Sequence, residues 1–303
     1  MTHLRIGTRG SRLALAQANW VKACLAAREP NLAAEIRVIK TSGDRFVEMP
    51  IQNIGGKGVF TKEIEEALLQ NEIDVAVHSM KDLPTQLPAG LAIVAVPKRE
   101  DSRDALVTRS KIALGALPQG AILGTGSLRR RAQLLNFRSD LSVQPIRGNI
   151  DTRLRKLDEG QVDGLVMAAA GLKRIGCGER IGDLLTDDIC VSAVAQGALA
   201  IESRDDADIR RQLAFLHDDI AYAEISAERA FLDRLGGGCH VPIGARARVS
   251  NGNLAMIGVV ASPDGRRLCR GAIDGAAVAA IELGRQLAER LLNQGAERLL
   301  ASA

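Results

Sequence analysis

A run of polar residues follows a short apolar segment and has the composition needed for acid–base chemistry. The segment Ile73–Val77 predicts a buried strand, and His78, Ser79, Lys81 and Asp82 come directly after it. Because ligands of α/β sheets bind beyond the carboxyl ends of strands, Asp82 is a candidate general acid or base. Burial would raise the pKa of Asp82 and the charge of Lys81 would lower it, so the direction stays open. An ordinary polar turn also fits the pattern.

A glycine-rich loop carries one of the five cysteines. Three glycines, Gly236–Gly238, precede Cys239 and leave its thiol open to a bulky partner. His240 comes next, but residues adjacent in sequence seldom form a nucleophile–base pair, so a catalytic dyad is not favoured.

Two similar segments predict sites for small anions. Gly7–Arg12 and Gly124–Arg129 each join a strand to a helix, and a helix N-terminus with arginines beside it binds carboxylate or phosphate. The candidate ligands are Arg9, Ser11, Thr125, Ser127, Arg129 and Arg130. Helix capping by Ser11 and Ser127 is the simpler alternative.

Another glycine-rich stretch, Gly55–Gly58, contains Lys57 but departs from a nucleotide-binding loop. Ile51 stands where the first glycine of that motif belongs, and Gly58 replaces its serine or threonine. The lysine suits a loop that closes over an anion, or an exposed hairpin. Gly124–Gly126 likewise lacks the third glycine of a dinucleotide fingerprint.

The amino-acid composition excludes some classes of ligand and favours others. The chain has 303 residues and a net charge of +4 from 40 basic and 36 acidic residues, with its arginines clustered. Aromatic residues make up only 2%, which disfavours single-stranded nucleic acid and favours small polyanions. The four histidines have no metal-ligand spacing, so no metal site is predicted. Five scattered cysteines, with neither a signal peptide nor a membrane span, predict a cytoplasmic protein.

The elements that position these residues fall into three groups. The first third alternates strands and helices in βαβ order, with a mostly parallel sheet. Its predicted elements are Leu4–Thr8, Leu13–Ala27, Ile36–Ile39, a helix from Thr61, Ile73–Val77 and Leu91–Val96. After Pro97–Asp101, a charged stretch suited to a hinge, the alternation restarts. The elements there are Ala121–Gly124, Ser127–Phe137, Leu141–Ile146, Asp151–Leu157 and Gly164–Ala169.

The final third has a different, α+β pattern. A helix at Ile225–Leu235 precedes three strands, and a long amphipathic helix at about Ala276–Leu292 follows them. The strands Ala245–Val249, Leu254–Ala261 and Arg267–Ile273 are joined at Asn251–Gly252 and Asp264–Gly265, which are hairpin signals. Residues 198–216 lie between the second and third groups, and their own pattern does not show which sheet they join.

Motifs in family order make the chain similar to the porphobilinogen deaminase family over nearly its whole length. The stretch Glu228–Gly244 around Cys239 resembles the family's cofactor-attachment signature. The other matching motifs are Gly55–Gly58, Val77–Pro84, Ser127–Arg130, Arg147–Asn149, Ala170–Arg174 and Gln196–Gly197.

The resemblance implies a transferase that joins four porphobilinogens head to tail, with loss of ammonia, into hydroxymethylbilane for haem and other tetrapyrroles. It implies a dipyrromethane cofactor held by a thioether to Cys239, and Asp82 as the catalytic acid–base group. The cofactor would contact Ser11, Lys57, Lys81, Asp82, Thr125, Ser127, Arg129, Arg130, Arg147 and Arg153. The substrate would contact Arg9, Ser11, Phe60, Arg147, Arg153, Arg174 and Gln196.

For the fold, the resemblance implies two periplasmic-binding-protein-like α/β domains with a cleft between them, and a C-terminal α+β domain with a three-stranded antiparallel sheet. The first domain would comprise residues 1–97 with 198–216, the second 102–192, and the third 222–303. The family also suggests a monomer. Asn53 and Gly126 depart from the residues expected there, lysine and serine, and put two cofactor contacts in doubt.

Two other functions also fit the clustered arginines. A two-lobed anion-binding protein would need neither Asp82 nor Cys239, and it would release no ammonia from porphobilinogen. A nucleic-acid-binding protein would bind any duplex with an affinity that falls steeply with salt.

Overall fold

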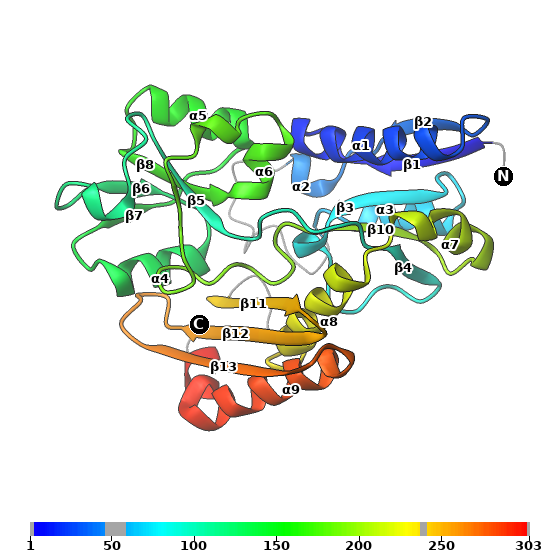
Figure 1. Ribbon diagram of the computed structural model, residues 1–303. Helices are drawn as coiled ribbons and strands as arrows, with labels where there is room; N and C mark the ends of the chain where they lie inside the picture. Colours follow the sequence, from blue (N-terminus) through cyan, green and yellow to red (C-terminus); the bar gives the residue numbers. More distant parts are fainter. Residues whose placement is uncertain (1–2, 46–58, 237–240, 302–303) are drawn as a thin grey trace. The chain divides into compact units, whose positions relative to one another are not determined.

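The computed structural model describes residues 3–45, 59–236 and 241–301 (Figure 1). The chain forms two compact units. The first unit contains residues 1–99 and 198–222, and the second contains residues 100–197 and 223–303.

The first unit is built on a five-stranded sheet with strand order β2-β1-β3-β10-β4. Strands β1, β2, β3 and β4 run in one direction, and β10 is inserted antiparallel between β3 and β4. The strands are β1 (His3–Thr8), β2 (Ala33–Val38), β3 (Val75–Ser79), β4 (Leu91–Ala95) and β10 (Leu199–Arg204). The helices are α1 (Arg12–Arg28), α2 (Ser42–Arg45), α3 (Lys62–Leu69) and α7 (Ala207–Leu213), with 3-10 turns η2 (Met80–Asp82) and η5 (Ala214–Leu216).

Alternation along β3 gives this sheet two apolar faces. Val75 and Val77 pack with α1 and α7, whereas Ala76 faces α3 on the other side. Sheets with helices on both faces bury their strands, which explains why Ile73–Val77 is an almost continuous apolar run. Helices therefore cover both faces of β3.

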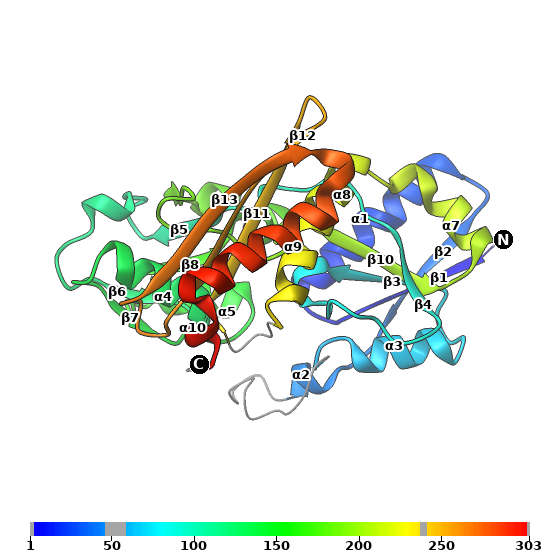
Figure 2. The ribbon, with the colours of Figure 1, turned by 90° about the horizontal axis from the view of Figure 1, so that it is seen from below.

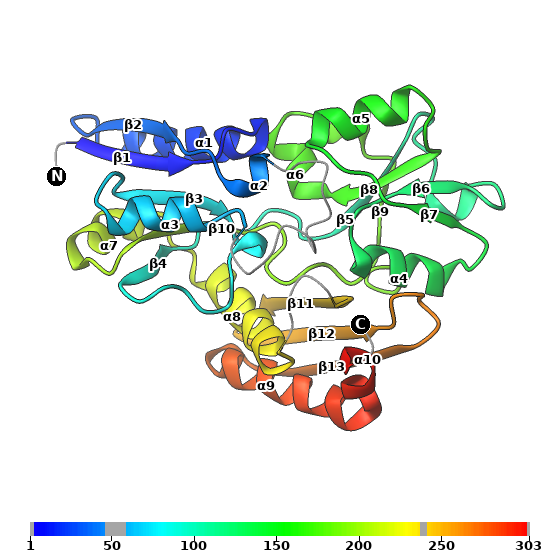
Figure 3. The same ribbon diagram turned by 180° about the vertical axis from the view of Figure 1, so that it is seen from behind.

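The second unit contains another five-stranded sheet, with order β7-β6-β8-β5-β9 (Figure 3). Here β5 is the antiparallel strand. The strands are β5 (Asp104–Thr108), β6 (Ile122–Gly124), β7 (Ser142–Gln144), β8 (Gly164–Ala168) and β9 (Asp183–Leu184). Its helices are α4 (Leu128–Phe137), α5 (Ile150–Asp158) and α6 (Ala169–Arg174), with 3-10 turns η3 (Leu114–Ala116) and η4 (Gly178–Arg180). Leu134 of α4 packs on one face of the sheet, and Leu154 and Leu172 of α5 and α6 pack on the other.

The same unit contains a three-stranded antiparallel sheet, β11 (Ile243–Ser250), β12 (Asn253–Ala261) and β13 (Leu268–Ala276). Figure 2 shows α9 running along this sheet. Gly258 of β12 faces Phe231 and Leu287, and a Cβ atom there would lie 2.6 Å from the Phe231 ring. Gly258 therefore admits α8 and α9 to the same face. The helices are α8 (Asp219–Arg234), α9 (Ala280–Leu291) and α10 (Glu297–Ala301), with the 3-10 turn η6 (Ala277–Ala279) and the π-helical segment η7 (Leu292–Ala296).

The predicted fold class, two α/β sheets and a C-terminal three-stranded antiparallel sheet, is confirmed. The sequence pattern missed β5 and β9, and it did not show the antiparallel strand in each α/β sheet. Within the described ranges, no helix is long and apolar enough to cross a membrane.

Candidate active site

Asp82 lies in an exposed turn at the end of β3. The 3-10 turn η2 contains Met80, Lys81 and Asp82, and the last two side chains are exposed. The Met80 N–H donates to the Ala198 carbonyl at 3.0 Å, and the Leu83 N–H donates to the Met80 carbonyl at 3.1 Å. These bonds fix the turn and leave the Asp82 carboxylate open to a ligand.

His78 differs from its neighbours in the same polar run. Its side chain is buried, and Nε2 lies 3.0 Å from Oε2 of the buried Glu202 on β10. His78 therefore faces inward between strands, and does not join Lys81 and Asp82 on the exposed turn.

Arg9, Ser11 and Phe60 belong to the same unit as Asp82. Strands β1 and β3 are neighbours and parallel, so the residues that follow them lie at one edge of the sheet. The Arg9 guanidinium carbon is 4.2 Å from the centroid of the Phe60 ring, which makes a cation–π contact. The Ser11 hydroxyl caps α1 by accepting the Ala14 N–H at 3.2 Å. Capping uses the acceptor side of a hydroxyl and leaves its proton for donation.

In the second unit, Thr125 and Ser127 form the turn from β6 into α4. The Ser127 N–H donates to Thr125 Oγ1 at 3.3 Å, and Ser127 Oγ accepts the Arg130 N–H at 3.4 Å. Ser11 and Ser127, which occupy the two similar strand-to-helix segments, are therefore both helix N-caps. The ten-residue helix α4 also begins with basic rather than acidic side chains. Its N-terminus therefore favours an anion.

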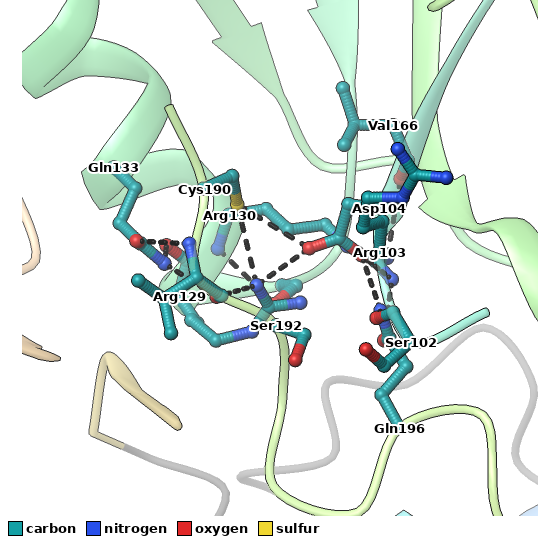
Figure 4. Close-up of polar contacts among 12 residues, drawn as sticks. Ser102, Arg103, Asp104, Arg129, Arg130, Gln133, Val166, Cys190, Ser192 and Gln196 are labelled. Carbon is teal, nitrogen blue, oxygen red and sulfur yellow. Dashed lines mark hydrogen bonds and ion pairs between the residues drawn. The ribbon is translucent and has the colours of Figure 1, made fainter. Parts of the chain in front are cut away.

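Arg129 and Arg130 in the first turn of α4 are buried and converge on Asp104 of β5 (Figure 4). Arg129 Nη1 donates to Asp104 Oδ2 at 2.7 Å, and Arg130 Nε donates to Oδ1 at 2.8 Å. Burial alone would raise the pKa of Asp104, but the two guanidinium charges outweigh it and hold the pKa below its usual range. Asp104 is therefore ionised at neutral pH.

Further cations belong to this unit. Arg153 Nε donates to the Gly148 carbonyl at 2.7 Å, and burial together with the charges of Arg130 and Arg147 lowers its pKa to about 10. Arg174 Nη2 donates to the Gly197 carbonyl at 2.6 Å, and burial lowers its pKa to about 10. A lowered pKa means that positive charge is held at a cost, and a bound anion would relieve it.

Gln196 is fully buried, and its side chain is bound within the protein. Its Nε2 donates to Asp104 Oδ1 at 2.9 Å and to the Ser102 carbonyl at 2.8 Å, and its Oε1 accepts from Arg130 Nη2 at 3.2 Å. Cys239, Lys57 and Asn53 lie outside the described residues.

The sequence pattern did not identify Asp104 of the second unit or Gln17 of the first as part of the candidate site. An acidic residue at the head of the apolar run Ala105–Val107 is a detectable signal, because a charge in a buried strand needs a partner. Gln17 gave no such signal, because glutamine is common on helices. Its bond to Ser79 depends on how α1 packs on the sheet.

Comparison with known proteins gives one family. Residues 4–211 match the family model "Porphobilinogen deaminase, dipyromethane cofactor binding domain", and residues 222–293 match "Porphobilinogen deaminase, C-terminal domain". A porphobilinogen deaminase of Syntrophotalea carbinolica is 50% identical over 300 residues, covering 99% of this chain and 95% of that protein. One of Desulforudis audaxviator is 53% identical over 297 residues, covering 98% and 96%.

Likeness to solved structures is much weaker. A putative methionine-binding lipoprotein from Bacillus subtilis is 10% identical, with a TM-score of 0.44 over 72% of this chain and 91% of that one. A likeness of this degree identifies neither a ligand nor a function.

Proposed function

This chain belongs to the porphobilinogen deaminase family and has its activity, hydroxymethylbilane synthesis for tetrapyrroles, and we propose that Asp82 and the arginines described above perform it. The reaction joins four porphobilinogens head to tail. One ammonia leaves for each carbon–carbon bond that forms, and water releases the finished chain.

Asp82 is proposed as the acid–base residue. Its carboxylate is exposed on a turn that backbone bonds hold in place, so it can approach a substrate without rearrangement. There it would assist departure of ammonia from the aminomethyl group and stabilise positive charge on a pyrrole nitrogen. The neighbouring ammonium of Lys81 would hold the substrate's carboxylates. The exposed, anchored position of Asp82 is the single observation that carries this assignment.

The arginines are proposed to hold the acetate and propionate groups that every porphobilinogen carries. Guanidinium groups pair with carboxylates through two parallel hydrogen bonds and keep their charge at all physiological pH values. Arg153 and Arg174 have lowered pKa values, so an anionic partner would stabilise their charged forms. Arg147 would act with them. In the first unit, Arg9 and Ser11 would also bind these carboxylates, and Phe60, which contacts Arg9, would lie beside the pyrrole ring.

The described residues also fit the dipyrromethane cofactor that the matching family model names. That group carries carboxylates, and the first turn of α4 combines N–H groups, hydroxyl donors and two arginines whose combined charge one carboxylate does not cancel. We propose that Thr125, Ser127, Arg129, Arg130 and Arg153 hold it, with Ser11, Lys57, Lys81 and Asp82, and that Cys239 anchors it. The bound group supplies the pyrrole carbon to which the first substrate is joined.

Mass spectrometry of the intact, denatured protein tests this proposal. We expect the wild type, after incubation with porphobilinogen, to exceed its polypeptide mass by at least two condensed porphobilinogens, and Cys239→Ser to show no excess. The bare polypeptide mass in both would contradict the proposal. Measured release of ammonia separates an enzyme from a protein that only binds the substrate.

We also propose that the enzyme is monomeric and works in the cytoplasm. The monomer is the family's suggestion, and scattered cysteines suit a reducing compartment. Gel filtration with light scattering tests the first part, and a dimer mass would contradict it.

A further inference from the structure

We propose that Asp104 is a positioning residue: its buried carboxylate, with Gln196, fixes Arg129 and Arg130 so that together they receive one carboxylate of the cofactor or growing chain. The proposal rests on the function proposed above and assigns a role to a residue that touches neither substrate nor cofactor.

The geometry places Asp104 at the centre of a bonded cluster. Oδ2 accepts from Arg129 Nη1 at 2.7 Å and from the Cys190 thiol at 3.4 Å. Oδ1 accepts from Arg130 Nε at 2.8 Å and from Gln196 Nε2 at 2.9 Å. Each carboxylate oxygen thus holds one arginine, and each has a second donor that fixes its direction. Figure 4 shows these side chains meeting around Asp104.

Backbone carbonyls orient the same two guanidinium groups. Arg129 Nη1 also donates to the Val191 carbonyl at 2.6 Å, and Arg130 Nη1 donates to the Val166 carbonyl at 3.2 Å. Long flexible side chains lose rotamer freedom when held in this way, and that loss occurs on folding instead of on ligand binding. The pair is therefore preorganised.

The net charge of Arg129, Arg130 and Asp104 indicates which kind of ligand group the two arginines bind. Two guanidinium groups and one carboxylate leave a net charge of +1 in a buried cluster. Among the described residues, Asp104 is the carboxylate that forms an ion pair with either arginine. A buried uncompensated charge is costly, and a single further carboxylate would balance it. Without Asp104, two adjacent buried cations would repel each other and the pair would lose its geometry.

The thiol of Cys190 supports the arrangement as a neutral donor. Burial, together with the charge of Asp104, raises the pKa of Cys190 to about 12. The thiol therefore stays protonated and adds no negative charge.

The test compares Asp104→Asn with Asp140→Asn. Asp140 pairs with Arg138, the C-cap residue of α4, so the control also removes a carboxylate from an arginine at an end of that helix. After incubation with porphobilinogen, we expect Asp104→Asn to have wild-type circular dichroism but to lose most of the mass excess, whereas Asp140→Asn retains it. A full mass excess with a wild-type KM in Asp104→Asn would overturn the proposal.

Gln196→Leu keeps the proposal testable if Asp104→Asn does not fold, because it leaves the charge of the cluster unchanged. We expect its KM for porphobilinogen to rise about fivefold with little change in kcat, since Arg130 loses one anchor. A merely structural role would lower the melting temperature and leave KM as it is, and that result would also overturn the proposal. If the wild type itself acquires no mass excess, the function proposed above has failed. If wild type and variants acquire it equally, only the role of Asp104 has failed.

Discussion

The side-chain amide of Gln17 donates a 2.9 Å hydrogen bond to the hydroxyl of Ser79. Gln17 is buried on α1, and Ser79 is the last residue of β3, directly before the turn that carries Asp82. The bond ties the turn to a helix packed on the sheet. Together with the bond from Met80 to the Ala198 carbonyl, it determines where the Asp82 backbone lies.

Removing the hydrogen bond between Gln17 and Ser79 is expected to slow catalysis without unfolding the protein. In Gln17→Leu the Ser79 hydroxyl loses its donor, and small displacements of a catalytic group are costly, so kcat should fall about tenfold. Steady-state kinetics on porphobilinogen measure the effect. Gln212→Leu is the matched control, since it removes a bond to Glu29 elsewhere in the unit. Equal kcat in both variants would show that the tie has no part in positioning Asp82.

Asp82→Ala is expected to reduce turnover by about 10²-fold or more, the usual contribution of an acid–base group. Because the side chain is exposed and η2 is held by backbone bonds, the melting temperature should change little. Asp208→Ala changes another exposed aspartate of the unit and should leave turnover intact. Near-normal ammonia release by Asp82→Ala would contradict the assigned role.

Local signals were the part of the fold that the sequence predicted well. The Asn251–Gly252 turn has φ values of 51° and 77°, the left-handed conformation that this dipeptide adopts in tight hairpins. The register of β11 and β12 follows from it. Pairing between strands that lie far apart in the chain leaves no signal in the sequence of either strand. Nothing within Leu199–Arg204 indicates that this strand enters the sheet between β3 and β4, more than 100 residues earlier in the chain.

In the candidate site too, local features could be predicted from the sequence and long-range contacts could not. Helix N-termini with adjacent arginines were recognisable, because the glycine–serine turns and the basic residues are neighbours in sequence. The pairing of Arg129 and Arg130 with Asp104 was not recognisable, because the acidic first residue of β5 signals that a partner is needed but not that the partner comes from α4. The apolar pattern of β5 is broken at its first residue, Asp104. Only the folded protein shows that Arg129 and Arg130 of α4 bind its carboxylate.

Arg153→Leu is expected to impair cofactor acquisition, and Arg155→Leu is its matched control. Both residues are on α5, but Arg153 is half-buried near other cations, whereas Arg155 is exposed and pairs with Glu159. Loss of one charge-assisted carboxylate contact should raise KM about tenfold or prevent the mass excess. Intact mass and steady-state kinetics measure both effects. Equal behaviour of the two variants would count against carboxylate binding by Arg153.

The Arg103–Asp101 ion pair gives stability a defined pH dependence. Arg103 Nη2 lies 2.7 Å from Asp101 Oδ2, and this side-chain hydrogen bond lowers the pKa of Asp101 from 3.8 to about 2. A carboxylate whose pKa is lower in the folded state stabilises that state above its unfolded pKa, and the stabilisation disappears as pH falls through the folded value.

Melting temperatures of the wild type and Asp101→Asn should therefore differ most above pH 4 and converge as the pH falls towards 2. Asp158→Asn is the control, since that aspartate pairs with Arg180 at the surface and exposed pairs contribute little. The difference in melting temperature between wild type and Asp101→Asn could instead stay constant from pH 6 to pH 2. That result would mean that the neutral amide disturbs packing and that the charge of Asp101 does not stabilise the folded protein.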